Sequence, residues 1–189
     1  MDLVQRAKAM VLSPAAEWRA IEPETGDTHY LFTNYVAILA AIPPICAFLR
    51  GGLFGWGGAH LRHFHHGGFF SSLFGAVVHY LVAFVVVYAM AVIIDGLAPT
   101  FSGQKSQENA MKLAVYSMTP AWLAGVFALV PALGFLRLIA LLYSLYVFWL
   151  GLPILMKAPQ DRLGPYALTV ILSGIVLSLI VGAIVGPIV

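Results

Sequence analysis

Histidines crowd one short segment of the chain. Residues 51–68 read GGLFGWGGAHLRHFHHGG and hold four of the six histidines, which are His60, His63, His65 and His66. Neutral imidazoles bind Zn²⁺, Ni²⁺ or Cu²⁺, and an ordinary pKa of about 6.5 lets them respond to mild acid. No carboxylate or cysteine lies nearby to complete a strong site, and the glycines leave the segment soft. The pattern indicates either a divalent-metal site or a loop that only lies at a membrane surface.

Two more ionisable residues accompany a long apolar run. His79 lies well inside it, and a polar group at membrane depth is costly without a partner, so we expect it to face the bundle and hydrogen-bond a neighbouring helix. Proton relay is the alternative. Asp95 lies at the end of the same run. It is either a solvated helix-end charge or a partner for Lys105, Lys112 or a backbone donor.

Motifs of soluble enzymes are absent from the sequence. There is no HExxH, GxSxG, P-loop or Gly-rich dinucleotide fingerprint, and within the apolar runs only His79 could serve an intramembrane mechanism. We therefore expect no enzyme, no catalytic residue and no cofactor besides the metal considered above. The net charge of +2, without a dense run of Lys or Arg, argues against nucleic-acid binding.

The composition is that of a membrane protein. Hydrophobic residues make up 61% of the 189 residues and charged residues 10%, against roughly 45–50% and 25% in soluble domains. A helix needs roughly 20 apolar residues to cross a bilayer core, and five runs are long enough. They are Leu31–Leu49, Phe69–Ile94, Leu113–Val130, Phe135–Met156 and Tyr166–Val189. The sequence thus predicts an all-α, polytopic bundle of five transmembrane helices, residues 31–189.

Residues 1–30 are predicted to form a separate, cytoplasmic amphipathic arm. Apolar side chains recur there at helical spacing, and Ser13-Pro14 is a restart signal, with Ser13 as N-cap and Pro14 at the first helical position. We expect the arm to lie on the membrane surface with Trp18 as a headgroup-level anchor. The alternative is that it docks on the protein's own helices. No signal-peptide pattern precedes the first run, which we expect to be an uncleaved span.

Basic residues predict the orientation, because cytoplasmic loops carry the excess of Lys and Arg. With the N-terminus in the cytoplasm, seven basic residues fall on that side and three opposite. The seven are Arg6, Lys8, Arg19, Lys105, Lys112, Lys157 and Arg162, and the three are Arg50, Arg62 and Arg137. We therefore expect a cytoplasmic N-terminus and a C-terminus on the other side.

Small residues form a stripe in the last run, at strict four-residue spacing. They are Gly174, Ser178, Gly182 and Gly186, and the last two glycines make a GxxxG motif. Such stripes let helices approach closely. We expect them to pack within the monomer, and a homo-oligomer is the alternative.

Three short motifs resemble the Yip1 family in its compact bacterial form. VLSPAAEW, with Pro14 and Trp18, is similar to the family's entry into the first span. FSGQ and YSMTP follow in the family's order, and they supply Phe101, Gly103, Tyr116, Ser117 and Pro120. The five-span layout extends the likeness over the whole chain.

The resemblance implies a helical bundle in the bacterial inner membrane, with a cytoplasmic N-terminus and a periplasmic C-terminus. Eukaryotic members are associated with Golgi and endoplasmic-reticulum trafficking and with prenylated Rab GTPases. Their long cytoplasmic N-terminal domain is missing here, and Asp95-Gly96-Leu97-Ala98-Pro99 replaces their Asp-Leu-Tyr-Gly-Pro. That trafficking role therefore does not transfer.

Two functions remain open at this point. The first is a non-catalytic scaffold or adaptor of the Yip1 type, which organises membrane or cytoplasmic partner proteins, or lipids of the bilayer, through the arm and the polar segment Leu97 to Lys112. The second is a small transporter or channel for an ion, metal or small solute that uses His79 and helices broken by proline. The single ionisable group deep in the runs favours the scaffold.

Overall fold

The computed structural model describes residues 2–25, 27–53 and 69–187, and all regular structure in these ranges is helical. Five helical stretches are long and apolar enough to cross a membrane, which confirms the predicted count. They are Thr28–Gly51, Phe69–Phe101, Gln107–Leu129, Pro131–Leu155 and Gln160–Val185. The four histidines of segment 51–68 and Arg62 lie outside the described residues, so the metal prediction stays a prediction.

The arm forms two helices, α1 (Leu3–Leu12) and α2 (Pro14–Ile21). Pro14 starts α2 as expected, since a proline at the first helical position gives up no hydrogen bond. Ser13 occupies the predicted N-cap position of α2, but its side chain makes no capping hydrogen bond. The arm is therefore helical on both sides of Ser13.

The first span is broken into short pieces. They are α3 (Thr28–Leu31), the π-helical η1 (Phe32–Val36), α4 (Ala37–Leu39), α5 (Ile42–Phe48) and the π-helical η2 (Leu49–Leu53). Pro43 and Pro44 fall in the first turn of α5, where their missing N–H groups interrupt the backbone ladder between α4 and α5. The first span is therefore interrupted at these prolines.

The remaining spans follow in order. The second span consists of α6 (Phe69–Leu97) and η3 (Ala98–Phe101), and the third of α7 (Gln107–Ser117), α8 (Thr119–Leu123) and η4 (Ala124–Leu129). The fourth consists of η5 (Pro131–Leu133) and α9 (Gly134–Leu155), and the fifth is α10 (Gln160–Val185). The third span begins six residues before the predicted Leu113. Ser106 accepts a hydrogen bond from the backbone N–H of Asn109, so a polar turn outside the apolar run starts α7.

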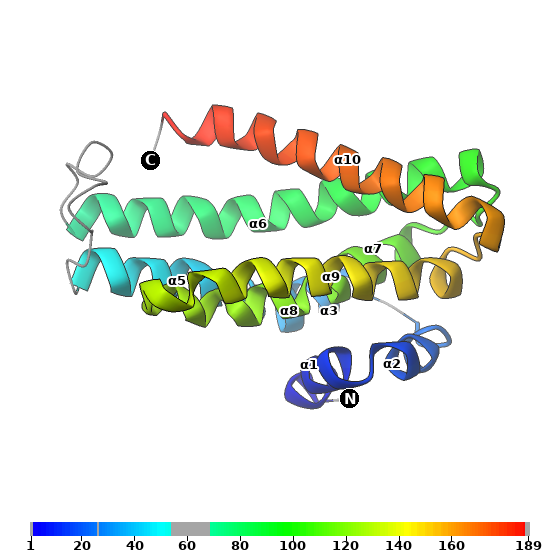
Figure 1. The fold of residues 1–189 in the computed structure, drawn as a ribbon, viewed down its shortest axis with the longest axis horizontal. Coiled ribbons are helices and arrows are strands. Elements are labelled where there is room, and N and C mark those ends of the chain that lie inside the picture. Colours follow the sequence, from blue (N-terminus) through cyan, green and yellow to red (C-terminus); the bar gives the residue numbers. More distant parts are fainter. Residues whose placement is uncertain (1, 26, 54–68, 188–189) are drawn as a thin grey trace.

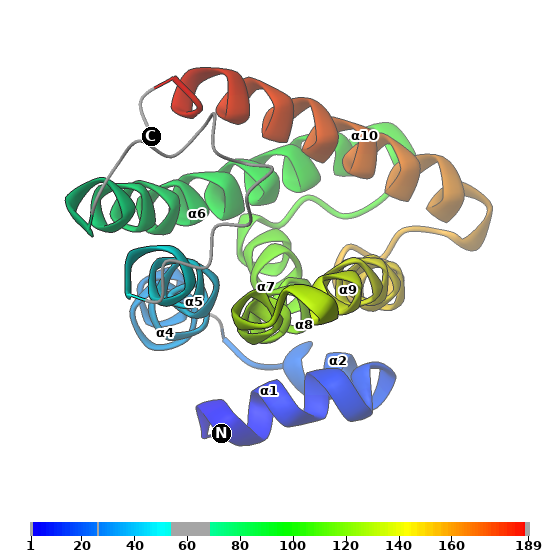
Figure 2. The same cartoon turned by 60° about the vertical axis from the view of Figure 1, so that its left-hand side comes forward.

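The helices form two faces around a central element. Helices α6 and α10 lie side by side on the face opposite α1 and α2 (Figure 1). Helix α7 runs through the middle, between α6 and α9 (Figure 2). Of the most apolar window in each span, 67% of residues are buried in the third and 6% in the last. The third span is the core of the bundle and α10 is its periphery.

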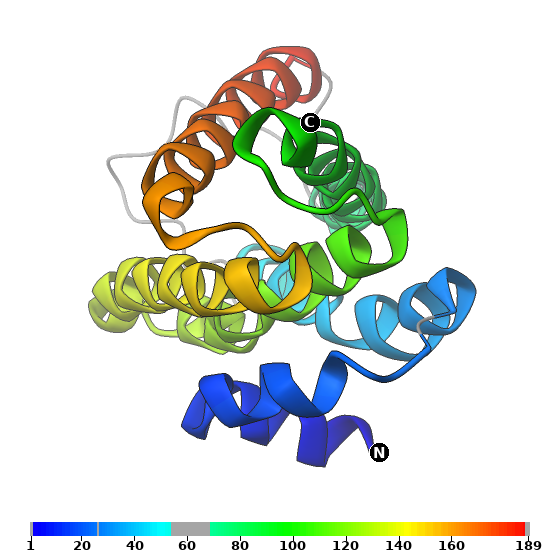
Figure 3. The same cartoon turned by 90° about the vertical axis from the view of Figure 1, so that its right-hand side faces the viewer.

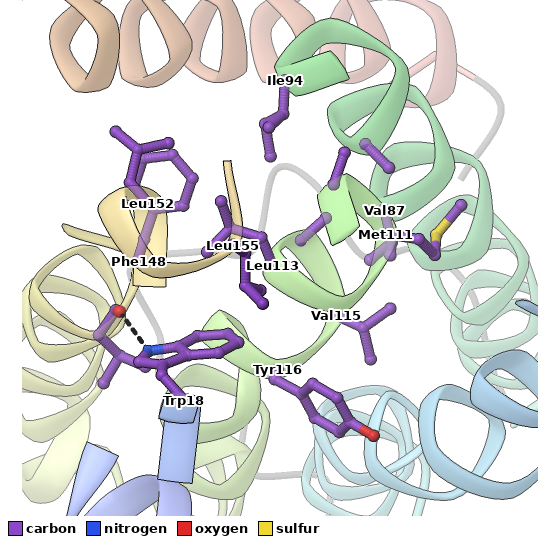
Figure 4. Packing of buried hydrophobic residues seen from close by; sticks show 14 of the residues in the cluster. Trp18, Val87, Ile94, Met111, Leu113, Val115, Tyr116, Phe148, Leu152 and Leu155 are labelled. Carbon is purple, nitrogen blue, oxygen red and sulfur yellow. Dashed lines mark hydrogen bonds between the residues drawn. The ribbon is translucent and has the colours of Figure 1, made fainter. Parts of the chain in front are cut away.

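Trp18 ties the arm to that core. Its side chain is fully buried, and the indole N–H donates to the backbone oxygen of Val147 in α9 at 2.9 Å (Figure 4). Opposite it stands Gly151, where a Cβ would lie 2.6 Å from the indole carbon Cε2, so only glycine leaves room for the ring. The expectation of a headgroup-level anchor is wrong: tryptophan suits both an interface and a core with a polar partner, and here the core prevails.

Candidate functional site

A buried charged cluster joins the two arm helices. The Arg6 guanidinium donates to Glu17 Oε1 at 2.6 Å and to Glu24 Oε1 at 2.5 Å. The side chains of Arg6 and Glu17 are 6% and 7% exposed, whereas that of Glu24 is 44% exposed. The cluster therefore has a buried cation on its inner side and a partly hydrated carboxylate on its outer side.

The electrostatic surroundings keep Arg6 charged. Burial works to lower the pKa of its guanidinium, but the hydrogen bond to Glu24 and the nearby carboxylates of Glu24 and Glu17 raise that pKa on balance. The guanidinium also lies over the ring of Tyr116, 5.6 Å from its centroid. Arg6 thus pairs with carboxylates of the arm and links the arm to α7 by a cation–π contact.

Lys112 brings a second buried cation to the same place. It lies in α7 and is 2% exposed. Its ammonium contacts Glu108 Oε1 at 2.9 Å and donates to the backbone oxygen of Glu24. Lys112 of α7 therefore holds the segment that follows α2.

A cavity of about 510 Å³ opens between the arm, the start of the first span and α7. Its lining mixes both signs of charge with aromatic rings and comprises Leu3, Arg6, Pro23, Glu24, Thr25, Asp27, Tyr30, Leu31, Asn34, Tyr35, Lys112 and Tyr116. That volume falls within the range of roughly 300–1,000 Å³ typical of small-molecule sites. Figure 3 shows the chain passing from α2 into the first span here.

Two family-motif residues meet beside this cavity. The rings of Trp18 and Tyr116 lie edge to face with centroids 6.3 Å apart, and Tyr116 makes a similar contact with Tyr35 at 4.8 Å (Figure 4 labels the first two). The Tyr35 hydroxyl is 2.8 Å from that of Thr119, which donates to the Tyr116 carbonyl. Motifs about a hundred residues apart in sequence thus build one contact.

The other residues of the family motifs contribute to helix ends and to contacts between helices. Ser117 donates to the Ala114 carbonyl at 3.3 Å, and Pro120 opens α8 after the α7 break. Phe101 stacks on Tyr166 of α10 with centroids 5.1 Å apart. At Gly103 a Cβ would lie 3.0 Å from the Met156 carbonyl, so the loop approaches the end of α9 closely there.

Asp95 is buried rather than solvated, with 7% of its surface exposed. Its Oδ2 lies 4.0 Å from the ammonium of Lys105, so Lys105 is the partner among those considered, while Lys112 binds elsewhere. Oδ1 is buried without a hydrogen-bond partner among the described residues. The solvated alternative is therefore wrong, because the carboxylate is buried at the end of α6 and lies beside Lys105.

His79 does not face the bundle. Its side chain is exposed on α6, and its Nδ1 lies 3.1 Å from the Gly75 carbonyl of the same helix. The expected bond to a neighbouring helix is not seen among the described residues, and the carbonyl four residues back is the partner of one ring nitrogen. The prediction that His79 faces the bundle is therefore wrong.

The small-residue stripe packs within the chain at one position. A Cβ at Gly174 would lie 3.2 Å from Met90 Cε of α6, whereas at Gly182 it would meet nothing within 4 Å. Ser178 is exposed and donates to the Gly174 carbonyl, and at Gly186 a Cβ would meet only backbone of Gly182. The close intramolecular approach expected along the stripe is thus seen only at Gly174.

Sequence reasoning missed the centre of this site. Arg6 and Lys112 were counted as cytoplasmic loop charges and Glu24 was not singled out, because their partners are up to 88 residues away along the chain. One signal was available: Arg6 follows Leu3 by three residues and precedes Met10 by four, so it falls on the apolar side of α1. Among the described residues, no three His, Cys, Asp or Glu side chains form a group that could hold a metal.

Five apolar spans and a docked helical arm define a multi-pass integral membrane protein. The family model named Yip1 domain matches residues 8–183, and the chain belongs to this family. It is 30% identical over 155 residues to "Inner membrane protein YohC" of Escherichia coli K12, a match that covers 79% of this chain and 77% of that protein. The protein of the same name from E. coli O6:H1 strain CFT073 matches equally. No solved structure matches.

Proposed function

We propose that this Yip1-family protein is a non-catalytic membrane adaptor that binds partners through its arm and the adjoining segment 97–112. The observation that carries the proposal is the fixed arm. Trp18 is fully buried and Arg6 is paired with two carboxylates, so α1 and α2 present their outer surface in one orientation. A rigid, charged surface needs little ordering to bind a partner.

The outer surface of this region carries exposed basic side chains beside the exposed carboxylates of Asp2, Glu24 and Glu108. Lys8 and Arg19 are exposed on α1 and α2, and the Lys105 side chain is 67% exposed in the segment after η3. Basic side chains cluster on the cytoplasmic side of membrane proteins, which supports a cytoplasmic location for the arm and the opposite location for the C-terminus. The relatives named as inner membrane proteins support placement in a bacterial inner membrane.

A transporter or channel is the second candidate, and one observation favours it. The first span is interrupted between α4 and α5 and contains two π-helical turns, and broken spans are common in transporters. Against this, most of the described ionisable residues lie in the arm or in the segments near it, and His79 lies on the outer surface of α6. The polar groups therefore suggest a surface for binding better than a path through the bilayer.

The test is native mass spectrometry of the protein extracted from its own membrane into nanodiscs. The double variant Lys8→Glu, Lys105→Glu reverses charge on the proposed surface, and Arg137→Glu reverses it at an exposed site near the start of α9. An adaptor keeps a stoichiometric partner in wild type and in Arg137→Glu and loses it in the double variant. A homo-oligomer with chelatable metal that disappears on replacing His63 and His65 would instead favour metal handling or transport.

A further inference from the structure

We propose that the cavity between the arm and the first span binds a phosphoethanolamine group, a phosphate diester that carries a primary ammonium. The site goes beyond the adaptor function, because it would exist whether or not a protein partner binds the arm. The argument rests on the arrangement of charge, on the aromatic lining and on the position of the cavity.

The charges of the lining suit a ligand that carries both signs. Four ionised side chains line the cavity, Arg6 and Lys112 as cations and Glu24 and Asp27 as carboxylates. The formal charges of these four side chains cancel, and Glu17 and Glu108, outside the lining, pair with the two cations. A purely anionic ligand therefore gains no net attraction, whereas a zwitterion can pair with both signs.

Among the four lining side chains the two signs also differ in exposure, although Glu24 bonds Arg6 directly. The side chains of Arg6 and Lys112 are 6% and 3% exposed, while Glu24 is 44% exposed and Asp27 lies at the surface. The phosphate of the ligand therefore belongs at the inner end and its ammonium at the mouth. With the opposite arrangement the ligand's ammonium would lie beside Arg6 and Lys112 and its phosphate beside Asp27.

Donors remain for the phosphate. A guanidinium has five N–H groups, and the bonds from Arg6 to Glu17 and Glu24 use two of them. An ammonium has three N–H groups, and Lys112 uses two on Glu108 and the Glu24 carbonyl. Planar guanidinium groups suit phosphate oxygens especially well.

The mouth suits an ammonium. Asp27 Oδ1 accepts the backbone N–H of His29, which leaves the second carboxylate oxygen to accept from a ligand. Tyr30 lies beside it, half exposed, and a tyrosine ring face attracts cations. A primary ammonium can use both features, since it donates hydrogen bonds as well as carrying charge.

The position favours a lipid as the source of the group. Tyr30, Leu31 and Asn34 lie in the first two turns of the span Thr28–Gly51, so this side of the cavity is at the level where the chain enters the bilayer. Headgroups occupy that level, and tyrosine is enriched there. A lipid could place its headgroup in the cavity with its chains in the membrane.

The test compares lipids on the full chain in nanodiscs made with equal amounts of phosphatidylethanolamine and phosphatidylglycerol. Native mass spectrometry then measures which lipid stays bound after ejection. Wild type is expected to retain phosphatidylethanolamine. Asp27→Asn keeps the cap of α3, because Asn caps as well as Asp, but loses the charge at the mouth. The expected result is a roughly two- to fivefold drop in preference, the size of one exposed ion pair.

Asp161→Asn is the matched control, because it removes an exposed carboxylate of α10 that does not line the cavity. A second variant, Glu24→Gln, should weaken the preference in the same direction as Asp27→Asn. Equal retention of both lipids by wild type, or equal effects of Asp27→Asn and Asp161→Asn, would overturn the proposal.

Soluble glycerophosphoethanolamine, added to nanodiscs that lack phosphatidylethanolamine, separates the two sources of the group. Saturable binding that Asp27→Asn weakens would support the cavity as a site for the free group. Retention of the lipid without such binding would support the lipid headgroup. Because these readouts involve no protein partner, the headgroup site and the adaptor function can fail separately.

Discussion

The third and the last spans differ sharply in what surrounds them. The third is buried over 67% of its most apolar window although its mean hydropathy there is 1.2, whereas the last has a mean hydropathy of 2.7 and is 6% buried. In a soluble protein the more apolar helix would be the buried one. Here lipid covers the apolar helix, while the polar side chains of the third span need protein partners.

The arm extends this comparison. It supplies Trp18 and Arg6 to the third span, so the most buried part of the bundle is completed by residues that lie outside any span. The structural centre of this protein is therefore the junction of the arm, α7 and α9. Four substitutions test this, in order of decreasing effect.

Trp18→Ala should lower the free energy of unfolding by about 3–5 kcal/mol, because it empties a fully buried site and removes the hydrogen bond to Val147. Thermal unfolding in detergent measures it. Trp149→Ala in α9 is the control, since that side chain is 43% exposed, and it should have a much smaller effect. Equal effects of the two would contradict a docked arm.

Arg6→Gln should destabilise by about 3 kcal/mol, because it leaves the carboxylate of Glu17 buried without its cation. The control is Arg19→Gln on the exposed side of α2. Denaturant titration of both variants in the same detergent gives the comparison. A loss at Arg6 no larger than that at Arg19 would show that the cluster does not hold the arm.

Gly151→Ala should cost about 1–3 kcal/mol, because the new methyl group would overlap the indole of Trp18. Gly182→Ala in α10 should be neutral or slightly stabilising, because nothing lies within 4 Å of its Cβ. This pair contrasts core and periphery with one chemical change. If Gly182→Ala proves the more harmful, α10 packs against a second copy through its stripe.

Tyr166→Phe should cost about 1 kcal/mol, since it removes the hydrogen bond from the hydroxyl to the Ile94 carbonyl, 2.6 Å long, which joins α10 to α6. Tyr146→Phe, at a side chain that is 52% exposed, is the control. Thermal unfolding of both variants measures how much the hydrogen bond of Tyr166 contributes to holding α10 against α6.

Hydropathy predicted the spans because crossing a bilayer requires long apolar runs, whatever the tertiary packing. The burial of Trp18 was not predictable in the same way, since tryptophan occurs both at interfaces and in cores. His79 was misplaced because a helix offers its own carbonyl as a partner. Asp95 was left with two interpretations, and its burial in the folded chain decided between them.

The charged cluster was harder to predict than the spans, because its residues come together only in the folded chain. Arg6, Glu17 and Glu24 are separated by a turn whose direction local sequence does not specify, and Lys112 comes from another span. The position of Arg6 on the apolar side of α1 was the one local sign that it is buried. Long-range pairing of this kind follows from packing, which a single sequence does not display.

Hydrogen exchange of the arm in nanodiscs tests the central claim most directly. The amides of α1 and α2 should be protected as a unit, to the same extent in zwitterionic and in anionic lipid, and Arg6→Gln should abolish that protection while that of α9 persists. Protection that requires anionic lipid and is unaffected by Arg6→Gln would mean that the arm lies on the membrane surface and not on the bundle.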